Sequence, residues 1–385
     1  MNPMPMRLTF ALALLFHTAV QAGRVLLTLY ALKFGADPFA VGVLAAMFSA
    51  MPMLLSWRIG RLVDRFGARR PLMFGGLCGA LGMLAPYLWP GMPALYLAAV
   101  LNGLLFAFCA TPLQNLVGLL SRPVDSARNF SNFSLVISTA GFTGPLLAGF
   151  SIDHAGHANA CLALVAMSLA PVLLLAVRGG LLPGGTGQAR PAGSIRDMLA
   201  SPGLWRVLLT GSLIVTGIDL FLFYMPIYGH GIGLSASAIG VVLAMFFISS
   251  FIVRLLIPSL LARLGEERML AAAFLLGAAG LALAPFFKGV AVLATVSFLF
   301  GIGMGCGQPV TLMLTFRTSE AGRSGEVLGL RVTINYISRM IGPVVFGAIG
   351  SAFGHFPVFW ITAAMLGSGS AFTRSGGGPE KSRRL

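Results

Sequence analysis

The sequence predicts an all-α membrane protein of twelve transmembrane helices, arranged as two pseudo-symmetric six-helix bundles. Three observations support this class. Of the 385 residues, 57% are hydrophobic and only 10% are charged, a composition too apolar for a soluble globular protein. The charged residues form short clusters separated by apolar runs of about 20 residues, the length that crosses about 30 Å of hydrocarbon. The two halves of the chain also align with each other at one offset.

Each apolar run is expected to be a helix, because lipid cannot satisfy the hydrogen-bonding groups of an exposed backbone. The clusters of charged residues, glycine and proline between the runs mark where each helix ends. In chain order the predicted helices cover residues 8–32, 38–58, 71–89, 93–120, 130–152, 158–178, 204–228, 236–260, 269–287, 289–315, 325–352 and 356–373.

The longest interior connection divides the helices six and six. It contains LLPGGTGQARPAGS, and its Gly, Pro and Ser content is typical of a linker. The sequence therefore predicts an N-terminal bundle over residues 1–178, a cytoplasmic linker over 179–203, a C-terminal bundle over 204–373 and a cytoplasmic tail over 374–385.

The basic residues predict the orientation in the membrane. With the N-terminus in the cytoplasm, only Lys33 and Lys288 of the basic residues between helices fall outside, so the positive-inside rule places both termini in the cytoplasm. Arginine far outnumbers lysine, which is typical of a GC-rich bacterium, so a bacterial plasma (inner) membrane is expected. Four arginines are left inside the membrane, away from its cytoplasmic side: Arg24, Arg254, Arg331 and Arg339.

Several other classes lack support in the sequence. The net charge of +15 sits in short loops without interleaved aromatic residues, which favours topology over nucleic-acid binding. The four cysteines lie singly in apolar runs, so neither a metal site nor a redox role is expected. The chain has no GxxxxGK[ST] motif for ATP. We expect no enzymatic activity and no cofactor, with a proton gradient as the energy source, and a monomer surrounded by lipid.

The chain contains an internal repeat at an offset of 198 residues. VGVLAAMF at 41–48 aligns with IGVVLAMF at 239–246, and IGRLVDRFGARR at 59–70 aligns with IPSLLARLGEER at 257–268. Gly144-Pro145 aligns with Gly342-Pro343 at the same offset. Because six helices return the chain to its starting side, both copies have the same orientation. This parallel-repeat arrangement is typical of secondary transporters that bind substrate between the halves near the midplane.

The sequence resembles the major facilitator superfamily over essentially its whole length. The stretch GRLVDRFGARR is similar to the signature G-x-x-x-D-R-x-G-R-R of that family, through Gly60, Asp64, Arg65, Gly67, Arg69 and Arg70. The resemblance implies a cytoplasmic latch between the halves, with Asp125 and Glu320 as the expected partners. The alternative is that these charges only set the topology. The second copy has Ala262 in place of Asp64, so a latch would be one-sided.

Ionisable groups inside predicted helices are candidate transport residues, because each costs a few kcal/mol to insert. Asp219 is the only carboxylate away from the ends of the predicted helices, and it aligns with Gln21, one helical turn from Arg24. Asp219 and Arg24 are therefore expected to be neighbours in a central cavity. Asp219 is either the proton site or a permanent structural partner of Arg24.

The eleventh predicted helix carries a polar stripe. Arg331, Asn335 and Arg339 follow at i, i+4 and i+8, which spreads them over about 80° of one face. Arg254 lies near the cytoplasmic end of its helix, where it either joins the cavity or reaches the membrane surface. The excess of arginine over acid favours an anionic or zwitterionic substrate.

GFTGPLLAG at 141–149 resembles the fifth-helix element of drug/proton antiporters, and the resemblance implies that Gly144-Pro145 and Gly342-Pro343 bend and close-pack their helices. Ala99 stands where those antiporters carry an arginine, so any proton coupling is expected to involve Asp219. We expect proton-coupled export of a small organic, anionic or amphipathic compound by alternating access. The alternatives are proton-coupled uptake of an organic anion or siderophore-like metabolite, and a non-transporting membrane sensor.

Overall fold

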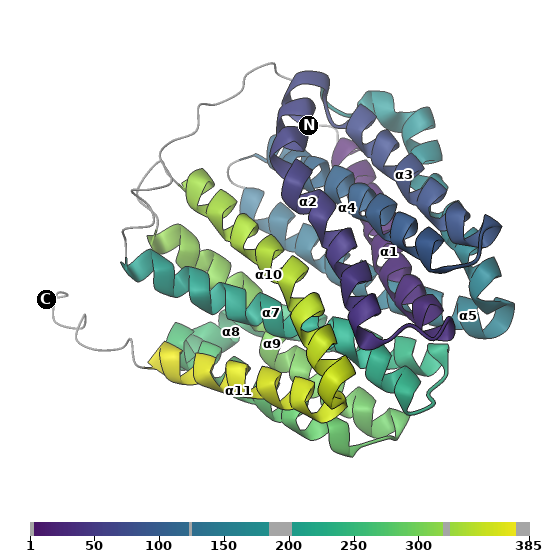
Figure 1. Ribbon diagram of the computed structural model, residues 1–385. Coiled ribbons are helices and arrows are strands. Elements are labelled where there is room, and N and C mark those ends of the chain that lie inside the picture. Colours follow the sequence, from purple (N-terminus) through teal and green to yellow (C-terminus); the bar gives the residue numbers. More distant parts are fainter. Residues whose placement is uncertain (1–3, 123–124, 185–201, 319–323, 375–385) are drawn as a thin grey trace, which may run out of the picture. The chain divides into compact units, whose positions relative to one another are not determined.

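The computed structural model describes residues 4–122, 125–184, 202–318 and 324–374. Throughout these ranges the ordered elements are helices, with no strand, which confirms the all-α class (Figure 1). The α-helices are α1 (Met4–Lys33), α2 (Pro38–Phe66), α3 (Arg69–Leu88), α4 (Met92–Leu120), α5 (Ser126–Arg178), α7 (Pro202–Gly231), α8 (Ala236–Leu283), α9 (Val290–Thr318), α10 (Ser324–Phe353) and α11 (His355–Arg374). The 3₁₀ turns are η1 (Gly179–Leu181) and η2 (Ala284–Phe286).

The helices make this a multi-pass membrane protein. Among the described residues, ten helical stretches are long and apolar enough to cross a bilayer. Both α5 and α8 exceed the length of one crossing, and the helical backbone breaks inside them at Gly156 (φ 79°) and Gly265 (φ 73°). Each break lies between two of the predicted helices. The total of twelve spans stays a prediction.

The signature GRLVDRFGARR is mostly helical, which corrects the predicted loop. α2 continues to Phe66, and α3 begins at Arg69, so that only Gly67 and Ala68 separate them. The prediction ended α2 where the apolar run ends. A helix needs apolar residues only while it is in lipid, however, and RLVDRF contains no residue that would stop a helix in water.

The predicted internal repeat is confirmed by the backbone. In the described residues six glycines have a positive φ, and no other residue type does. They form three pairs, each separated by 198 residues: Gly35 with Gly233, Gly67 with Gly265, and Gly156 with Gly354. Their φ values lie between 73° and 83°, where L side chains are strained. The two halves therefore turn at equivalent positions.

Helix caps follow the same repeat. The Asp37 carboxylate accepts a hydrogen bond of 2.9 Å from the amide of Ala40 at the start of α2. At the start of α8, 198 residues later, the Ser235 hydroxyl accepts one of 3.2 Å from the amide of Ala238. Both satisfy an amide that would otherwise lack a partner in the first helical turn.

Close helix crossings also repeat. A Cβ added at Gly103 of α4 would lie 2.3 Å from the carbonyl oxygen of Phe48 in α2. A Cβ at Gly301 of α9 would lie 2.4 Å from the carbonyl oxygen of Phe246 in α8. Each crossing requires glycine, because a methyl group would overlap with backbone. Such small-residue contacts are typical of helix packing in membranes.

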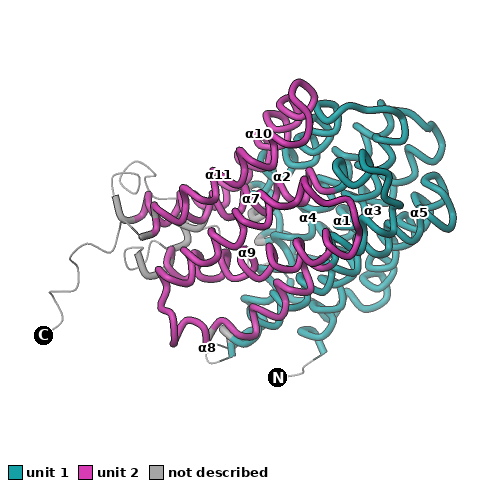
Figure 2. Tube along the Cα trace, turned by 90° about the horizontal axis from the view of Figure 1, so that it is seen from below, with its two compact units in different colours: residues 1–191, 226–244 teal, residues 192–225, 245–385 magenta. Residues whose placement is uncertain are grey.

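The chain forms two compact units (Figure 2). Unit 1 comprises residues 1–191 and 226–244, and unit 2 comprises residues 192–225 and 245–385. In unit 1, α1 and α3 each pack against α4 and α5, and α2 packs against α4. In unit 2, α10 packs against α9 and α11. α7 and α8 contribute to both units, since the residues that join them belong to unit 1.

The predicted bundles, residues 1–178 and 204–373, stay a prediction. Residues 185–201 of the linker and residues 375–385 of the tail lie outside the described residues.

Candidate functional site

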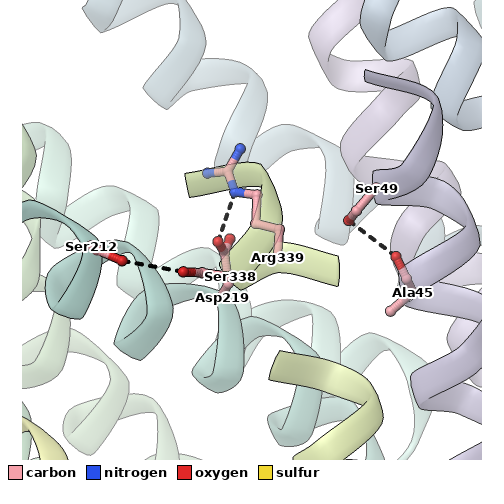
Figure 3. A network of polar contacts seen from close by, with 6 residues as sticks. All are labelled: Ala45, Ser49, Ser212, Asp219, Ser338 and Arg339. Carbon is pink, nitrogen blue, oxygen red and sulfur yellow. Dashed lines mark hydrogen bonds and ion pairs between the residues drawn. The ribbon is translucent and has the colours of Figure 1, made fainter. Parts of the chain in front are cut away.

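An ion pair joins α7 and α10 within unit 2. The Arg339 Nε donates to the Asp219 Oδ2 at 2.7 Å, and Figure 3 shows the guanidinium directed at the carboxylate. The two side chains are 22% and 12% exposed, respectively. The Arg339 guanidinium carbon also lies 5.8 Å from the centre of the Tyr336 ring. A charge-assisted bond this short, largely shielded from solvent, neutralises both charges inside predicted membrane helices.

The same two helices share a second polar contact. The hydroxyls of Ser212 and Ser338 are 3.1 Å apart, beside the ion pair in Figure 3. Ser212 precedes Asp219 by seven residues and therefore lies on the same face of α7. The contact between α7 and α10 is polar over two turns of helix.

Arg331 of α10 is held by α9 through neutral groups. Its guanidinium donates to the hydroxyls of Thr315 (3.0 Å) and Thr311 (2.9 Å) and to the carbonyl of Gln308 (3.3 Å). The residue is only 6% exposed. A Cβ at Gly211 of α7 would be 3.6 Å from the guanidinium carbon, so α7 closes over the group. Oxygen dipoles thus replace water around a buried cation.

The predicted polar stripe on α10 is divided between two neighbours. Arg331 bonds to α9 and Arg339 bonds to α7, because a rotation of about 80° between i and i+8 is enough for the two side chains to meet different helices. Asn335, midway between them, is partly buried. Its Oδ1 is buried and accepts no hydrogen bond from the described residues.

Arg254 of α8 is turned toward α9. Its Nε donates to the carbonyl of Gly305 at 3.4 Å, and the side chain is partly buried. A Cβ at Gly305 would be 2.7 Å from the Cα of Ser250, so the two helix backbones are close at this level. Arg254 thus contacts α9 within unit 2, and its role in a cavity or at the membrane surface stays a prediction.

Arg24 of α1 lies against aromatic rings of unit 1. Its guanidinium carbon is 4.1 Å from the centre of the Phe48 ring and 5.7 Å from that of Phe106. Such cation–π contacts offset part of the cost of burying a guanidinium. Two turns earlier in the same helix, His17 packs edge-on against Phe106 and Phe133. The predicted neighbourhood of Arg24 and Asp219 stays a prediction.

The two Gly-Pro elements differ in their packing. A Cβ at Gly144 of α5 would be 2.6 Å from the Cβ of Gln21 and 2.9 Å from the amide of Ala22, so α5 meets α1 closely there. Gln21 is thus partly buried at this helix contact. A Cβ at Gly342 would meet only a Leu220 methyl, at 3.7 Å. Pro145 and Pro343 both lie inside their helices.

The arginines of the signature make contacts inside unit 1. The Arg69 Nη2 donates to the Ala176 carbonyl at 3.2 Å, in the last turn of α5. A cation there stabilises the helix C-terminus. The guanidinium carbons of Arg65 and Arg70 lie 5.1 Å and 6.0 Å from the centre of the Phe66 ring.

The rest of the predicted latch is only partly described. Gly60 lies within α2, Gly67 ends that helix, and Asp125 directly precedes α5. The side chain of Asp64 and the whole of Glu320 lie outside the described residues. A latch between the halves therefore stays a prediction.

Sequence reasoning missed Asp153 of α5. Its carboxylate accepts hydrogen bonds from the amides of Ala236 (3.1 Å) and Ser237 (2.8 Å) and from the Ser237 hydroxyl, at the start of α8. The spacing of these residues could have indicated the contact. Pro145, Gly149 and Asp153 follow at i, i+4 and i+8, so the acid lies on the same face of the helix as the glycine that allows close packing.

Comparisons with known proteins agree with this architecture. The chain is 22% identical over 340 residues to Multidrug resistance protein 2 of Bacillus subtilis, covering 85% of this chain and 84% of the relative. It is 25% identical over 355 residues to the class C Tetracycline resistance protein of Escherichia coli, covering 84% of each. The solved structure of the peptide transporter POT in complex with sulfate has a TM-score of 0.80, at 16% identity, over 96% of this chain and 94% of that one.

The sequence profile described as Major Facilitator Superfamily matches residues 9–343 and also residues 231–383. Together these matches span nearly the whole chain, including both copies of the repeat. The protein therefore belongs to the Major Facilitator Superfamily.

Proposed function

We propose that this protein is a secondary active transporter of the bacterial plasma membrane that exports a small organic, amphipathic compound in exchange for protons. The family supports transport, and relatives named for multidrug and tetracycline resistance support export. We further propose alternating access by a monomer with cytoplasmic termini, without a resident cofactor and without enzymatic activity.

The observation that carries the coupling is the Asp219–Arg339 ion pair. Its carboxylate has three mutually exclusive states: paired with Arg339, protonated, or bound to a hydrogen-bond donor of the substrate. Because a proton and such a substrate occupy the same oxygens, binding of one expels the other. This competition is what exchange transport requires.

For an anionic substrate, the same ion pair favours binding of proton and substrate together instead of competition between them. This supports a second candidate function. A proton on Asp219 removes the charge that holds Arg339 and leaves the guanidinium able to bind a carboxylate or phosphate. Proton and anion then bind together. The protein would act as a proton-coupled uptake system for an organic anion.

The sign of proton movement tests both candidates. The purified protein is placed in liposomes that contain a trapped pH dye, under a clamped membrane potential, and a probe is added outside. Exchange with tetracycline makes the lumen alkaline, whereas cotransport with citrate makes it acidic. Either result is independent of the orientation in the bilayer.

Asp219→Asn is expected to abolish proton movement, because an amide cannot take up the proton. The matched control is Asp37→Asn, which removes a carboxylate outside the ion pair. Proton movement that survives Asp219→Asn would exclude this carboxylate as the coupling group.

A further inference from the structure

The start of α8 is attached to α5 by a three-point contact at Asp153. One carboxylate oxygen accepts from the Ala236 amide at 3.1 Å, and the other accepts from the amide (2.8 Å) and the hydroxyl of Ser237. Asp153 is exposed, so water has access to these bonds. The carboxylate lies at the positive end of the α8 dipole, which favours a negative charge.

Next to Asp153 the helices meet backbone to backbone. A Cβ at Gly149 of α5 would be 2.5 Å from the Ala236 carbonyl oxygen. A Cβ at Gly240 of α8 would be 2.6 Å from the Pro145 carbonyl oxygen. At both points the nearest atoms of the neighbouring helix belong to its backbone.

The contact spans the two halves defined by the repeat, although all its residues belong to unit 1. α5 lies in the first sequence half, and α8 lies in the second half, where its start aligns with the start of α2. Residues 226–244, which include the start of α8, group with unit 1 and have the same colour as α5 in Figure 2.

The repeat also shows that this contact is not an inherited scaffold element. The counterpart of Asp153 is Ser351, which has no carboxylate. The counterparts of Ala236 and Ser237 are Pro38 and Phe39, which lack the amide hydrogen and the hydroxyl, respectively. The carboxylate and two of its three donors are therefore specific to one half, unlike the glycine turns and the helix caps.

We propose that Asp153 and Ser237 form a releasable clasp that closes the transporter on the side opposite its termini. This inference rests on the alternating access of the proposed function, in which contacts between halves form in one state and break in the other. Asp153 acts as a positioning residue: its bonds hold the closed state, and their loss frees the start of α8 from α5. Water and α8's own residues can satisfy the freed groups, so release leaves no buried unpaired charge.

Distances between spin labels test the clasp without any substrate. In a variant with the four cysteines replaced by alanine, labels are placed at Ala155 and Ile232, and double electron–electron resonance is recorded on the full chain in nanodiscs. Asp153→Asn is expected to lower the ratio of short to long distances about tenfold, equivalent to about 1.4 kcal/mol. Ser237→Ala, which removes only the hydroxyl donor, should shift the ratio several-fold in the same direction.

Asp37→Asn is the matched control, since Asp37 also caps a helix N-terminus through its carboxylate, but within its own element. It should leave the distances unchanged, because asparagine still caps this helix and the cap does not join α5 to α8. An unchanged distribution in Asp153→Asn and Ser237→Ala, or an equal change in Asp37→Asn, would overturn the clasp. The proton experiment on Asp219 does not depend on this result, so either proposal can fail alone.

Discussion

Arg331 illustrates how a guanidinium is buried without a carboxylate. Two threonine hydroxyls and a carbonyl accept its hydrogen bonds. The same hydroxyls donate to carbonyls of their own helix: Thr311 to Gly307 at 2.8 Å and Thr315 to Thr311 at 2.7 Å. The hydroxyls therefore keep a partner when Arg331 is removed.

This arrangement predicts an unusual order of stability. Arg331→Lys keeps the charge but cannot reach three acceptors at once, and it should destabilise the fold by about 2 kcal/mol. Arg331→Met fills a similar volume without a charge and should be at least as stable as the parent, because buried charges are often replaced by apolar groups at little cost. Thermal unfolding in detergent measures both variants.

Transport by the Arg331→Met variant then separates two roles. Near-normal transport would identify Arg331 as a structural tie between α9 and α10. A stable but inactive variant would support the predicted role in substrate binding. A melting temperature of Arg331→Met well below that of Arg331→Lys would contradict the stability argument itself.

At the residue scale, the sequence identified Asp219 as exceptional but did not identify Arg339 as its partner. The prediction compared depths in the membrane, and by that measure Arg24 was suitable. Depth does not determine which helix faces which. Asp219 and Arg339 are 120 residues apart, and their contact follows from the packing of α7 on α10.

Between elements, the two Gly-Pro motifs predict opposite effects of the same substitution. Gly144→Ala forces a methyl group into the backbone of α1 and should cost about 1–3 kcal/mol. Gly342→Ala meets only a methyl group at 3.7 Å and gains helix propensity, so it should be neutral or slightly stabilising. Melting temperatures of the two variants check this pair, and equal losses would contradict it.

Helix positions were the most predictable feature at the element scale. Apolar runs located nearly every described helix within a few residues, since the membrane imposes length and composition together. Helix ends that lie outside the lipid were less predictable. α2 extends to Phe66 because the polar residues at its C-terminal end have adequate helix propensity. Hydropathy does not report where a helix ends in water.

For the whole molecule, reporter fusions test the predicted topology. Green fluorescent protein fused at either terminus should fluoresce, and alkaline phosphatase fused after Gly35 or Lys288 should be active, because positive-inside charges place those turns outside. Phosphatase activity from a fusion after Arg122 or Arg178 would exclude the predicted orientation. The series also counts the spans.

The repeat was the strongest whole-molecule signal in the sequence. Local similarity at one offset predicted equivalent halves, and the three glycine pairs bear this out because a positive φ tolerates almost no other residue. The clasp at Asp153 was not predictable by that route. It breaks the repeat, and it depends on a contact between residues 84 positions apart.

The paired glycine turns also bear on ancestry. An ancestor of half this length, working as two identical six-helix subunits, would already have contained these turns, since both copies retain them. Such a homodimer would display every side chain twice. From such an ancestor, an acid present once, as with Asp219 opposite Gln21 or Asp153 opposite Ser351, would become possible only after gene fusion, which lets one half acquire new chemistry while both keep their architecture.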